Sequence, residues 1–386
     1  MSSSKPFIKF VRISLSSAIM LSLASAVTAA PQIEQAYLNA DSDMVIEGSG
    51  FGGGPTVALH DDFSKAEISG GEVVFRPQAG EWFEARGESD SFHLDTENSR
   101  KNLHVRGAGH YSKLTFGIPD KSGPLGLKAF QEVYFSYTIK DLGEFPGPEG
   151  GLEQFSTVSA TKDAWMMFGD RGDNTSYAVS IGEPAGHDLY IPAWTGSGFV
   201  IAGNNTTMRP RFSQTELENA WDFGGWHTMM FHAELDPSEP YGPAEGFFSF
   251  LNKNAHHVNK RDGRFMEDQR SEGVPYASWD RIKFFAWMNT GDADVNRILD
   301  EVYVAIGENA NARLLISDGE SLENSSRVFH LSPKQWTDSE IVANFPDYLP
   351  DGNAYFLHVV DSENSFSEGF TLCQSCPKAP SVYPVE

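Results

Sequence analysis

Met44-Val-Ile-Glu-Gly-Ser-Gly-Phe-Gly (residues 44–52) lies near the start of the chain and indicates a strand that ends in a glycine-rich turn. Two stretches near the other end indicate further strands and turns: Trp336-Thr-Asp-Ser-Glu-Ile (336–341) and Leu349-Pro-Asp-Gly-Asn-Ala-Tyr-Phe-Leu-His-Val-Val (349–360). Each end would supply part of a small β-sandwich, and neither has enough strands to close one. We therefore expect the two ends to pair, which makes the residues between them an insert and the place to look for function.

The glycines at positions 48, 50, 52, 53 and 54 superficially suggest a phosphate-binding loop. Such a loop needs a following helix and usually a lysine. Here Pro55 and the β-rich Thr56-Val-Ala-Leu follow instead. We expect the glycines to serve a tight turn that needs positive φ angles.

The pattern Ile-x-Gly-Ser-Gly-Phe-Gly resembles the IPT/TIG family of immunoglobulin-like sandwiches, and the C-terminal stretch resembles the second half of the same domain. In that family the glycines shape the turn after the second strand and the Phe packs into the core. The resemblance implies one discontinuous domain made of residues 30–59 and 308–372. The alternative is a truncated N-terminal module and a separate C-terminal sandwich.

Composition favours an all-β, exported protein. The chain of 386 residues has 36 Gly, 21 Pro and 28 Phe, with short apolar runs between turn residues. Its formal net charge of -24 argues against nucleic acid and against anionic membrane surfaces as partners, because phosphates would be repelled.

Lysine and arginine precede the apolar stretch 13–26 and small residues follow it, so we expect a signal peptide over residues 1–29 and a secreted, extracellular or periplasmic protein. A membrane anchor is the alternative for this stretch, which is short for a span.

The only two cysteines, Cys373 and Cys376, stand at the beginning of the C-terminal tail, residues 373–386. Two thiolates cannot complete a structural zinc site. We expect a small disulfide that pins the tail in an oxidising compartment.

Residues 60–307 are rich in aromatic residues and contain short apolar runs separated by turn residues. The runs predict strands over 133–139, 164–168, 226–235, 246–252, 281–288 and 298–305, whereas only 214–220 predicts a helix. Many strands at this spacing favour a two-sheet sandwich or jelly roll. The order of signals, from Asp61-Asp-Phe through Trp226-His to Leu299-Asp-Glu-Val-Tyr-Val, resembles the concanavalin-A-like superfamily of lectins, laminin-G-like modules, glucanases and jelly-roll polysaccharide lyases.

Two predicted strands suggest a carbohydrate platform. Alternate residues of a strand face opposite sides, so Ile282 and Phe284 belong to the core while Arg281, Lys283 and Trp287 lie on the other face. Sugar rings stack on tryptophan, and their hydroxyl and carboxylate groups bind cationic side chains. The expected substrate-binding residues are Trp226, His232, Arg281, Lys283, Trp287, Trp165 and Tyr134. The alternative is a face that is merely solvated or covered by loops.

Enzyme activity requires further groups. The paired carboxylates of a retaining glucanase on one strand are missing. A polysaccharide lyase needs a Tyr or His base and a cation or amide that neutralises a uronate carboxyl. The candidates for these roles are His232, Tyr241, His256 and Arg261, although the Arg-Thr-Glu-Leu-Arg and Gln-Ile-His motifs of alginate lyases with this fold do not appear.

The sequence predicts no organic cofactor. Asp61, Asp62 and Asp300 lie at the two ends of the insert, where members of the resembled fold often hold a structural calcium ion. We therefore expect a secreted protein that binds an extracellular polysaccharide or glycoconjugate on a jelly-roll face. A lyase that cleaves a uronate-containing glycan by β-elimination is the alternative, and a non-catalytic surface or adhesion protein is a further one.

Overall fold

The computed structural model describes residues 29–82, 84–86, 92–97, 100–107, 113–117, 130–141, 160–167, 178–181, 200–202, 224–236, 243–253, 255–264, 279, 281–289, 295–346, 349 and 354–373. Strands make up nearly all of the regular structure within these residues, so the all-β prediction is confirmed. The predicted strands within the insert are present with small differences at their ends, whereas the predicted helix over 214–220 lies outside the described residues.

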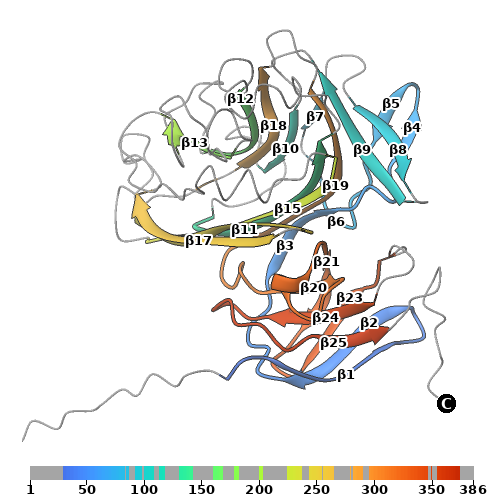
Figure 1. The fold of residues 1–386 in the computed structure, drawn as a ribbon, viewed down its shortest axis with the longest axis vertical. Coiled ribbons are helices and arrows are strands. Elements are labelled where there is room, and N and C mark those ends of the chain that lie inside the picture. The colour runs from blue at the N-terminus through green and yellow to red at the C-terminus, as the bar shows by residue number, and fades with distance from the viewer. Residues whose placement is uncertain are drawn as a thin grey trace, which may run out of the picture.

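The two ends of the chain build a small sandwich, which we call the terminal sandwich. Its first sheet has the order β1 (Gln32–Leu38), β2 (Asp43–Ser49), β23 (Glu340–Asn344), β22 (Pro333–Trp336). Its second sheet has the order β21 (Val328–Leu331), β20 (Arg313–Ser317), β24 (Tyr355–Val360), β25 (Phe370–Cys373). In Figure 1 the blue β2 lies beside the orange β23.

Direct pairing joins the two ends of the sequence. Met44 pairs with Ala343 and Ile46 with Ile341, in an antiparallel register. Phe51 and Ile46 are fully buried in one core with residues of the second sheet, such as Leu314 and Leu357. Since neither end holds enough strands to enclose this core, each end depends on the other for its stability.

The insert forms a larger, two-layered sandwich, which we call the central sandwich. One layer is a six-stranded sheet in the order β14 (Val200–Ala202), β13 (Ala178–Ile181), β12 (Ala160–Met167), β18 (Arg281–Asn289), β10 (Lys113–Gly117), β7 (Glu84–Arg86). The other layer is a nine-stranded sheet, whose main path is β17 (Ala255–Arg264), β16 (Pro243–Asn252), β15 (Trp226–Leu235), β11 (Glu132–Asp141), β19 (Val295–Ile306), β3 (Thr56–Asp61), β6 (Ala79–Gly80). Its other two strands are β9 (Arg100–Gly107), which pairs with β19, and β8 (Phe92–Glu97), which pairs with β9.

Two short elements complete the described structure. A hairpin is formed by β4 (Glu67–Ser69) and β5 (Glu72–Val74), and a 3-10 turn, η3, covers Leu322–Asn324.

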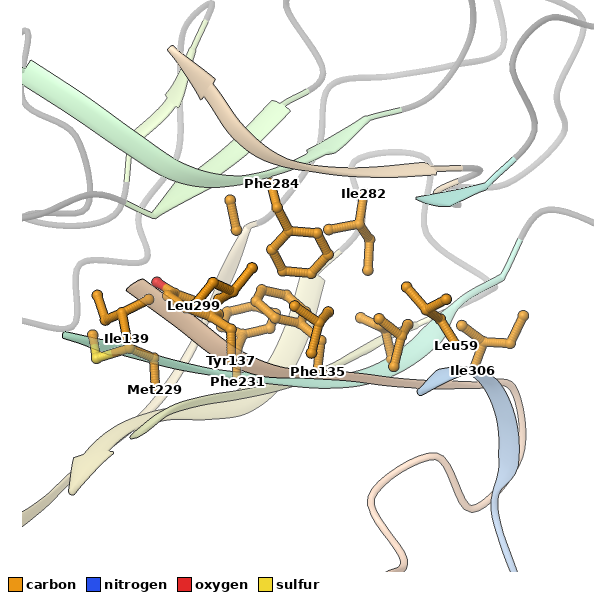
Figure 2. Close-up of a cluster of buried hydrophobic side chains, with 14 of the residues drawn as sticks. Leu59, Phe135, Tyr137, Ile139, Met229, Phe231, Ile282, Phe284, Leu299 and Ile306 are labelled. Carbon is orange, nitrogen blue, oxygen red and sulfur yellow. The ribbon is translucent and has the colours of Figure 1, made fainter. Parts of the chain in front are cut away.

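Strand periodicity explains the core of the central sandwich. Met229 and Phe231 of β15 and Phe135 of β11 alternate with residues that face the other way, and all three are buried. Figure 2 shows Ile282 and Phe284 pointing from β18 toward this layer of side chains. The ring centroids of Phe135 and Phe284 are 5.9 Å apart in an edge-on arrangement, which aromatic pairs favour.

The terminal sandwich covers the outer face of the nine-stranded sheet, and we call this contact layer the seam. In Figure 1 the two four-stranded sheets lie below the curved nine-stranded sheet. The side chains on this face of the nine-stranded sheet form one apolar cluster with residues of β20, η3, β21 and β24. Its members include Tyr134, Met230, Phe247, Leu251, Tyr303 and Ala305 from the sheet and Leu315, Leu322, Val328 and Val360 from the terminal sandwich. One face of the central sandwich is therefore used for holding the two units together.

Candidate functional site

The outer face of the six-stranded sheet carries part of the predicted platform. Trp165 of β12 pairs directly with Lys283 of β18, and Lys283 pairs with Thr115 of β10. Buried Ile282 and Phe284 flank Lys283 in sequence, so position 283 lies on the face away from the core. An aromatic, a cationic and a hydroxyl-bearing residue thus occupy one row across three strands. Arg281 occupies a position on the same face, two residues before Lys283 in β18.

A bulge separates Trp287 from this row. Phe284 pairs with Ala164 and Trp287 with Lys162, so two residues of β18 stand opposite one residue of β12. A bulge of this kind displaces the alternation of faces by one residue. In this register position 287 shares the face of buried Ala164, whereas positions 281 and 283 lie on the opposite face.

Tyr134, Trp226 and His232 lie on the nine-stranded sheet, across the core from Trp165. Tyr134 is fully buried in the seam, where burial raises the pKa of its hydroxyl group to about 12. The guanidinium group of Arg327 lies 4.3 Å from the centre of a Trp226 ring, and Nζ of Lys140 lies 5.5 Å from it. Nε2 of His232 lies 3.2 Å from Oε1 of Glu132. These three residues do not extend the row at Trp165.

The candidates for lyase chemistry are also distributed away from that row. His256 of β17 contacts the hydroxyl oxygen of Ser249 through Nε2, at 2.8 Å. Arg261 occupies a position further along β17, and Tyr241 lies outside the described residues. His232, His256 and Arg261 therefore belong to the nine-stranded sheet, and these three do not form one site with Trp165 and Lys283.

The three aspartates predicted to bind calcium accept hydrogen bonds from protein donors. Asp61 accepts from the backbone N–H of Phe63 at 2.8 Å and from Nε1 of Trp82 at 2.6 Å. Burial raises the pKa of Asp61 to about 6, although these hydrogen bonds oppose the shift. A carboxyl group of raised pKa with both oxygens engaged is a poor calcium ligand.

Asp62 and Asp300 have partners of their own. Asp62 accepts from Ser64 and from Nε2 of Gln78, the latter at 2.6 Å. Asp300 accepts from Nε of Arg100 at 2.6 Å and from Arg327 at 2.5 Å. The residues do not fit the calcium site that the sequence suggested. Among the described residues, no three histidine, cysteine or acidic side chains gather closely enough to hold a metal ion.

The predictions for the two termini fall largely outside the described residues. Residues 1–28 and Cys376 are not described, and Cys373 is the last residue of β25. No helix within the described part of the chain is long and apolar enough to cross a membrane.

The seam contains a buried polar cluster that the sequence reasoning missed. Glu301 of β19 accepts hydrogen bonds from the backbone N–H of His330 and from its Nδ1, and Nε2 of His60 lies 3.9 Å from the same carboxylate. Burial alone would raise the pKa of Glu301, but the hydrogen bond from His330, supported by His60, lowers it below its usual value. The signal was available, because Asp300 and Glu301 are charged residues within the otherwise apolar run 298–306.

Arg313 also belongs to this cluster. Its Nη1 donates to the backbone oxygen and the side chain of Asn311, at 2.6 and 2.9 Å, and its Nη2 donates to Asn364 at 2.7 Å. The guanidinium group lies 4.6 Å from the centre of the Tyr134 ring. Burial lowers the pKa of Arg313, and these acceptors and the ring face stabilise its charge.

Comparisons with known proteins give distant structural matches. No family model and no curated protein matches the chain. A marine PL-14 alginate lyase from Aplysia kurodai aligns at 12% identity over 57% of this chain and 88% of its own, with a TM-score of 0.34. Lectin II from Ulex europaeus aligns at 10% identity over 56% and 90%, with a TM-score of 0.30. The receptor binding domain of botulinum neurotoxin type G aligns at 10% identity over 79% and 72%, with a TM-score of 0.36. At these scores the likeness carries no conclusion on family or function.

Proposed function

We propose that this chain is an exported carbohydrate-binding protein that holds an extracellular polysaccharide against the outer face of the six-stranded sheet. The observation that supports this proposal is the direct register of Trp165 with Lys283 and of Lys283 with Thr115 on the face away from the core. Tryptophan offers an apolar ring face for the C–H groups of a sugar, and lysine and threonine offer hydrogen bonds to its hydroxyl groups.

The other face of the central sandwich is unsuitable for this task. Tyr134 and Met230 are buried there beneath the terminal sandwich. We propose that the terminal sandwich is an immunoglobulin-like unit of the IPT/TIG type that supports the central sandwich and presents its six-stranded sheet. The resemblance of residues 44–52 and 336–360 to that family supports this part of the proposal.

A glycan array followed by calorimetric titration of the best ligand tests the proposal. We expect Trp165→Ala to weaken binding about tenfold, which corresponds to about 1.4 kcal/mol. Trp226→Ala, on the other sheet, is the matched control and should bind the same glycan with unchanged affinity. Equal affinity of the Trp165→Ala variant and the unchanged protein would exclude the platform.

Two results would favour the other candidate functions. Release of unsaturated uronate products, detected by their ultraviolet absorbance, would indicate a lyase, and its base would have to be sought outside His232 and His256. Absence of both binding and turnover across the array would indicate a surface or adhesion protein without a glycan ligand.

A further inference from the structure

A cleft of about 360 Å³ lies where the terminal sandwich meets the central sandwich. The terminal sandwich supplies one wall from the turn between β1 and β2 and from the ends of β22 and β23. The central sandwich supplies the other wall with Lys65, which follows β3, and Gln78, which precedes β6. Pockets for small molecules typically measure about 300–1,000 Å³ and occur preferentially between domains. The cleft is therefore large enough for one small ligand.

Four polar side chains that line the cleft have no partner. Within the described part of the chain, Asp41, Ser42, Lys65 and Asn344 make no hydrogen bond or ion pair through their side chains. They comprise a carboxylate, a hydroxyl group, an ammonium group and an amide. Together these groups both donate and accept hydrogen bonds. A ligand that carries several hydroxyl groups would satisfy all four types.

The charges of the cleft cancel, although the chain has a net charge of -24. Nζ of Lys334 lies 2.5 Å from Oδ1 of Asp43, so this pair is neutralised within the wall. Lys65 then balances Asp41. A balanced set of charges gives no net attraction for an anionic polymer or for a metal cation. Phe345, which also lines the cleft, offers an apolar surface beside the polar groups.

The walls are held in place before any ligand binds. Oδ1 of Asn39 accepts hydrogen bonds from the backbone N–H groups of Asp41 and Asp43, at 2.9 and 3.0 Å, which fixes the turn on the terminal side. Nε2 of Gln78 donates to Asp62 at 2.6 Å, which fixes the central side. A preformed site lowers the entropic cost of binding.

The geometry points to this cleft as a binding site for a neutral saccharide unit, formed jointly by the two sandwiches. Its residues share no position with the row at Trp165, so either site can fail without the other. The inference rests on the cavity and its unpartnered groups and not on the function proposed for the six-stranded sheet.

Nuclear magnetic resonance of the whole protein tests the inference directly. The probes are the methyl glycosides of glucose, galactose, mannose and N-acetylglucosamine, at concentrations on the order of 10 mM, which suffice for a Kd in the millimolar range. The side-chain amide signals of Asn344 and Gln78 should shift with at least one probe. The methyl glycoside of glucuronic acid serves as the charged comparison and should cause smaller shifts.

Two variants separate the cleft from other sites. Asn344→Leu should weaken the bound saccharide about tenfold, because the removed amide leaves ligand groups unpaired. Trp165→Ala and the exposed Asn324→Leu should leave cleft binding unchanged. The inference is overturned if no neutral probe shifts the two amides, if the charged probe binds more tightly than every neutral one, or if Asn344→Leu binds with unchanged affinity.

Discussion

Nδ1 of His330 lies 2.5 Å from Oε1 of Glu301, and this contact joins the terminal sandwich to the nine-stranded sheet. The other ring nitrogen of His330, Nε2, lies 3.0 Å from the hydroxyl oxygen of Tyr134. Burial lowers the pKa of His330 in spite of Glu301, so the imidazole is neutral near pH 7. Its Nδ1–H then donates to the carboxylate, and its Nε2 accepts from Tyr134. The seam therefore depends on a chain of three side chains from two separate units.

Replacing Glu301 by glutamine tests how much this chain of contacts contributes. Glutamine keeps one acceptor oxygen but removes the negative charge, and a hydrogen bond to a charged group contributes about 1.5–3 kcal/mol. We expect Glu301→Gln to lower the free energy of unfolding in urea by about 2 kcal/mol. Glu308→Gln, in an exposed turn near the end of β19, is the control and should change it by less than about 0.5 kcal/mol. Similar values for both variants would contradict the role of Glu301.

Two buried tyrosines of the seam offer a matched pair. The hydroxyl group of Tyr134 reaches His330, whereas that of Tyr303 is buried without a hydrogen-bond partner in the described structure. Removing the hydroxyl group of Tyr134 should lower the free energy of unfolding by about 1 kcal/mol, and removing that of Tyr303 should leave it unchanged or raise it. We therefore expect Tyr134→Phe to lower the urea midpoint and Tyr303→Phe to leave it unchanged or raise it. The reverse order would show that the two hydroxyl groups have been assigned the wrong roles.

His330 also predicts how stability depends on pH. Its pKa is lowered in the folded protein from an ordinary value of 6.5, so the unfolded chain binds the proton more readily. The contribution of His330 to the free energy of unfolding is complete above pH 6.5, and it is lost as the pH falls below that value. The groups that face it are Glu301, Tyr134, Tyr303, His60 and Arg313. Among these, Glu301 loses its contribution to stability only at much lower pH, because its pKa in the folded protein is lowered below the ordinary carboxyl range.

Comparison of the unchanged protein with His330→Gln isolates this effect. We expect the difference in unfolding free energy between the two proteins to shrink from pH 7 to pH 5. Asp61 acts in the opposite direction, because its pKa is raised to about 6 and its contribution is lost as the pH rises through that value. Asp61 is present in both proteins, so its effect cancels in the difference. A difference that stays constant over this range would contradict the assignment to His330.

Strand positions could be predicted from the sequence because alternation is a local property. Alternation along the predicted strand 226–235 separates Met229 and Phe231 from Met230, and the structure buries them in two different clusters. Sequence alternation did not show that the second face is covered by a distant part of the chain. Tyr134 and His330 are 196 residues apart, so a local sequence pattern cannot predict their contact.

Bulges account for the other differences. One extra residue in β18 moves Trp287 out of the row of Lys283. A second irregularity in β19 sets Thr138 opposite Glu301 and Ile139 opposite Leu299, which leaves Asp300 as an extra residue. Bulged residues escape strict alternation, so two neighbouring acids can both serve polar contacts, Asp300 with Arg327 and Glu301 with His330. Periodicity alone cannot locate such an insertion.

Three tryptophan variants distinguish binding from stability. Trp165→Ala should weaken glycan binding by about 1–3 kcal/mol and leave the unfolding free energy nearly unchanged. Trp287→Ala, on the core-facing register of β18, should lower the unfolding free energy by more than about 1 kcal/mol. Trp226→Ala removes the ring beneath Arg327 and should cost about 0.5–2 kcal/mol in stability, with no change in glycan affinity. Calorimetric titration and urea unfolding measure the two quantities separately, and a loss of glycan affinity in Trp226→Ala alone would move the platform to the other sheet.

The glycines of residues 48–54 serve two different purposes, and alanine substitutions should reveal both. Gly50 and Gly52 have φ angles of 71° and 66°, which confirms the predicted need for positive φ at these two positions. Gly48 lies instead in β2, where a Cβ atom would stand 1.9 Å from the backbone oxygen of Gln32.

The φ angle is the only obstacle at Gly52, since no atom lies within 4 Å of the position a Cβ would take. Gly52→Ala should therefore cost about 1–2 kcal/mol. Gly48→Ala must push β1 and β2 apart, and we expect a loss of about 3 kcal/mol or more from the overpacked contact. Because β2 also pairs with β23, the weakened edge should expose Met44 and Ala343 to faster amide hydrogen exchange in Gly48→Ala. Equal exchange rates and equal stability in the two variants would show that the close approach at Gly48 does not constrain the terminal sandwich.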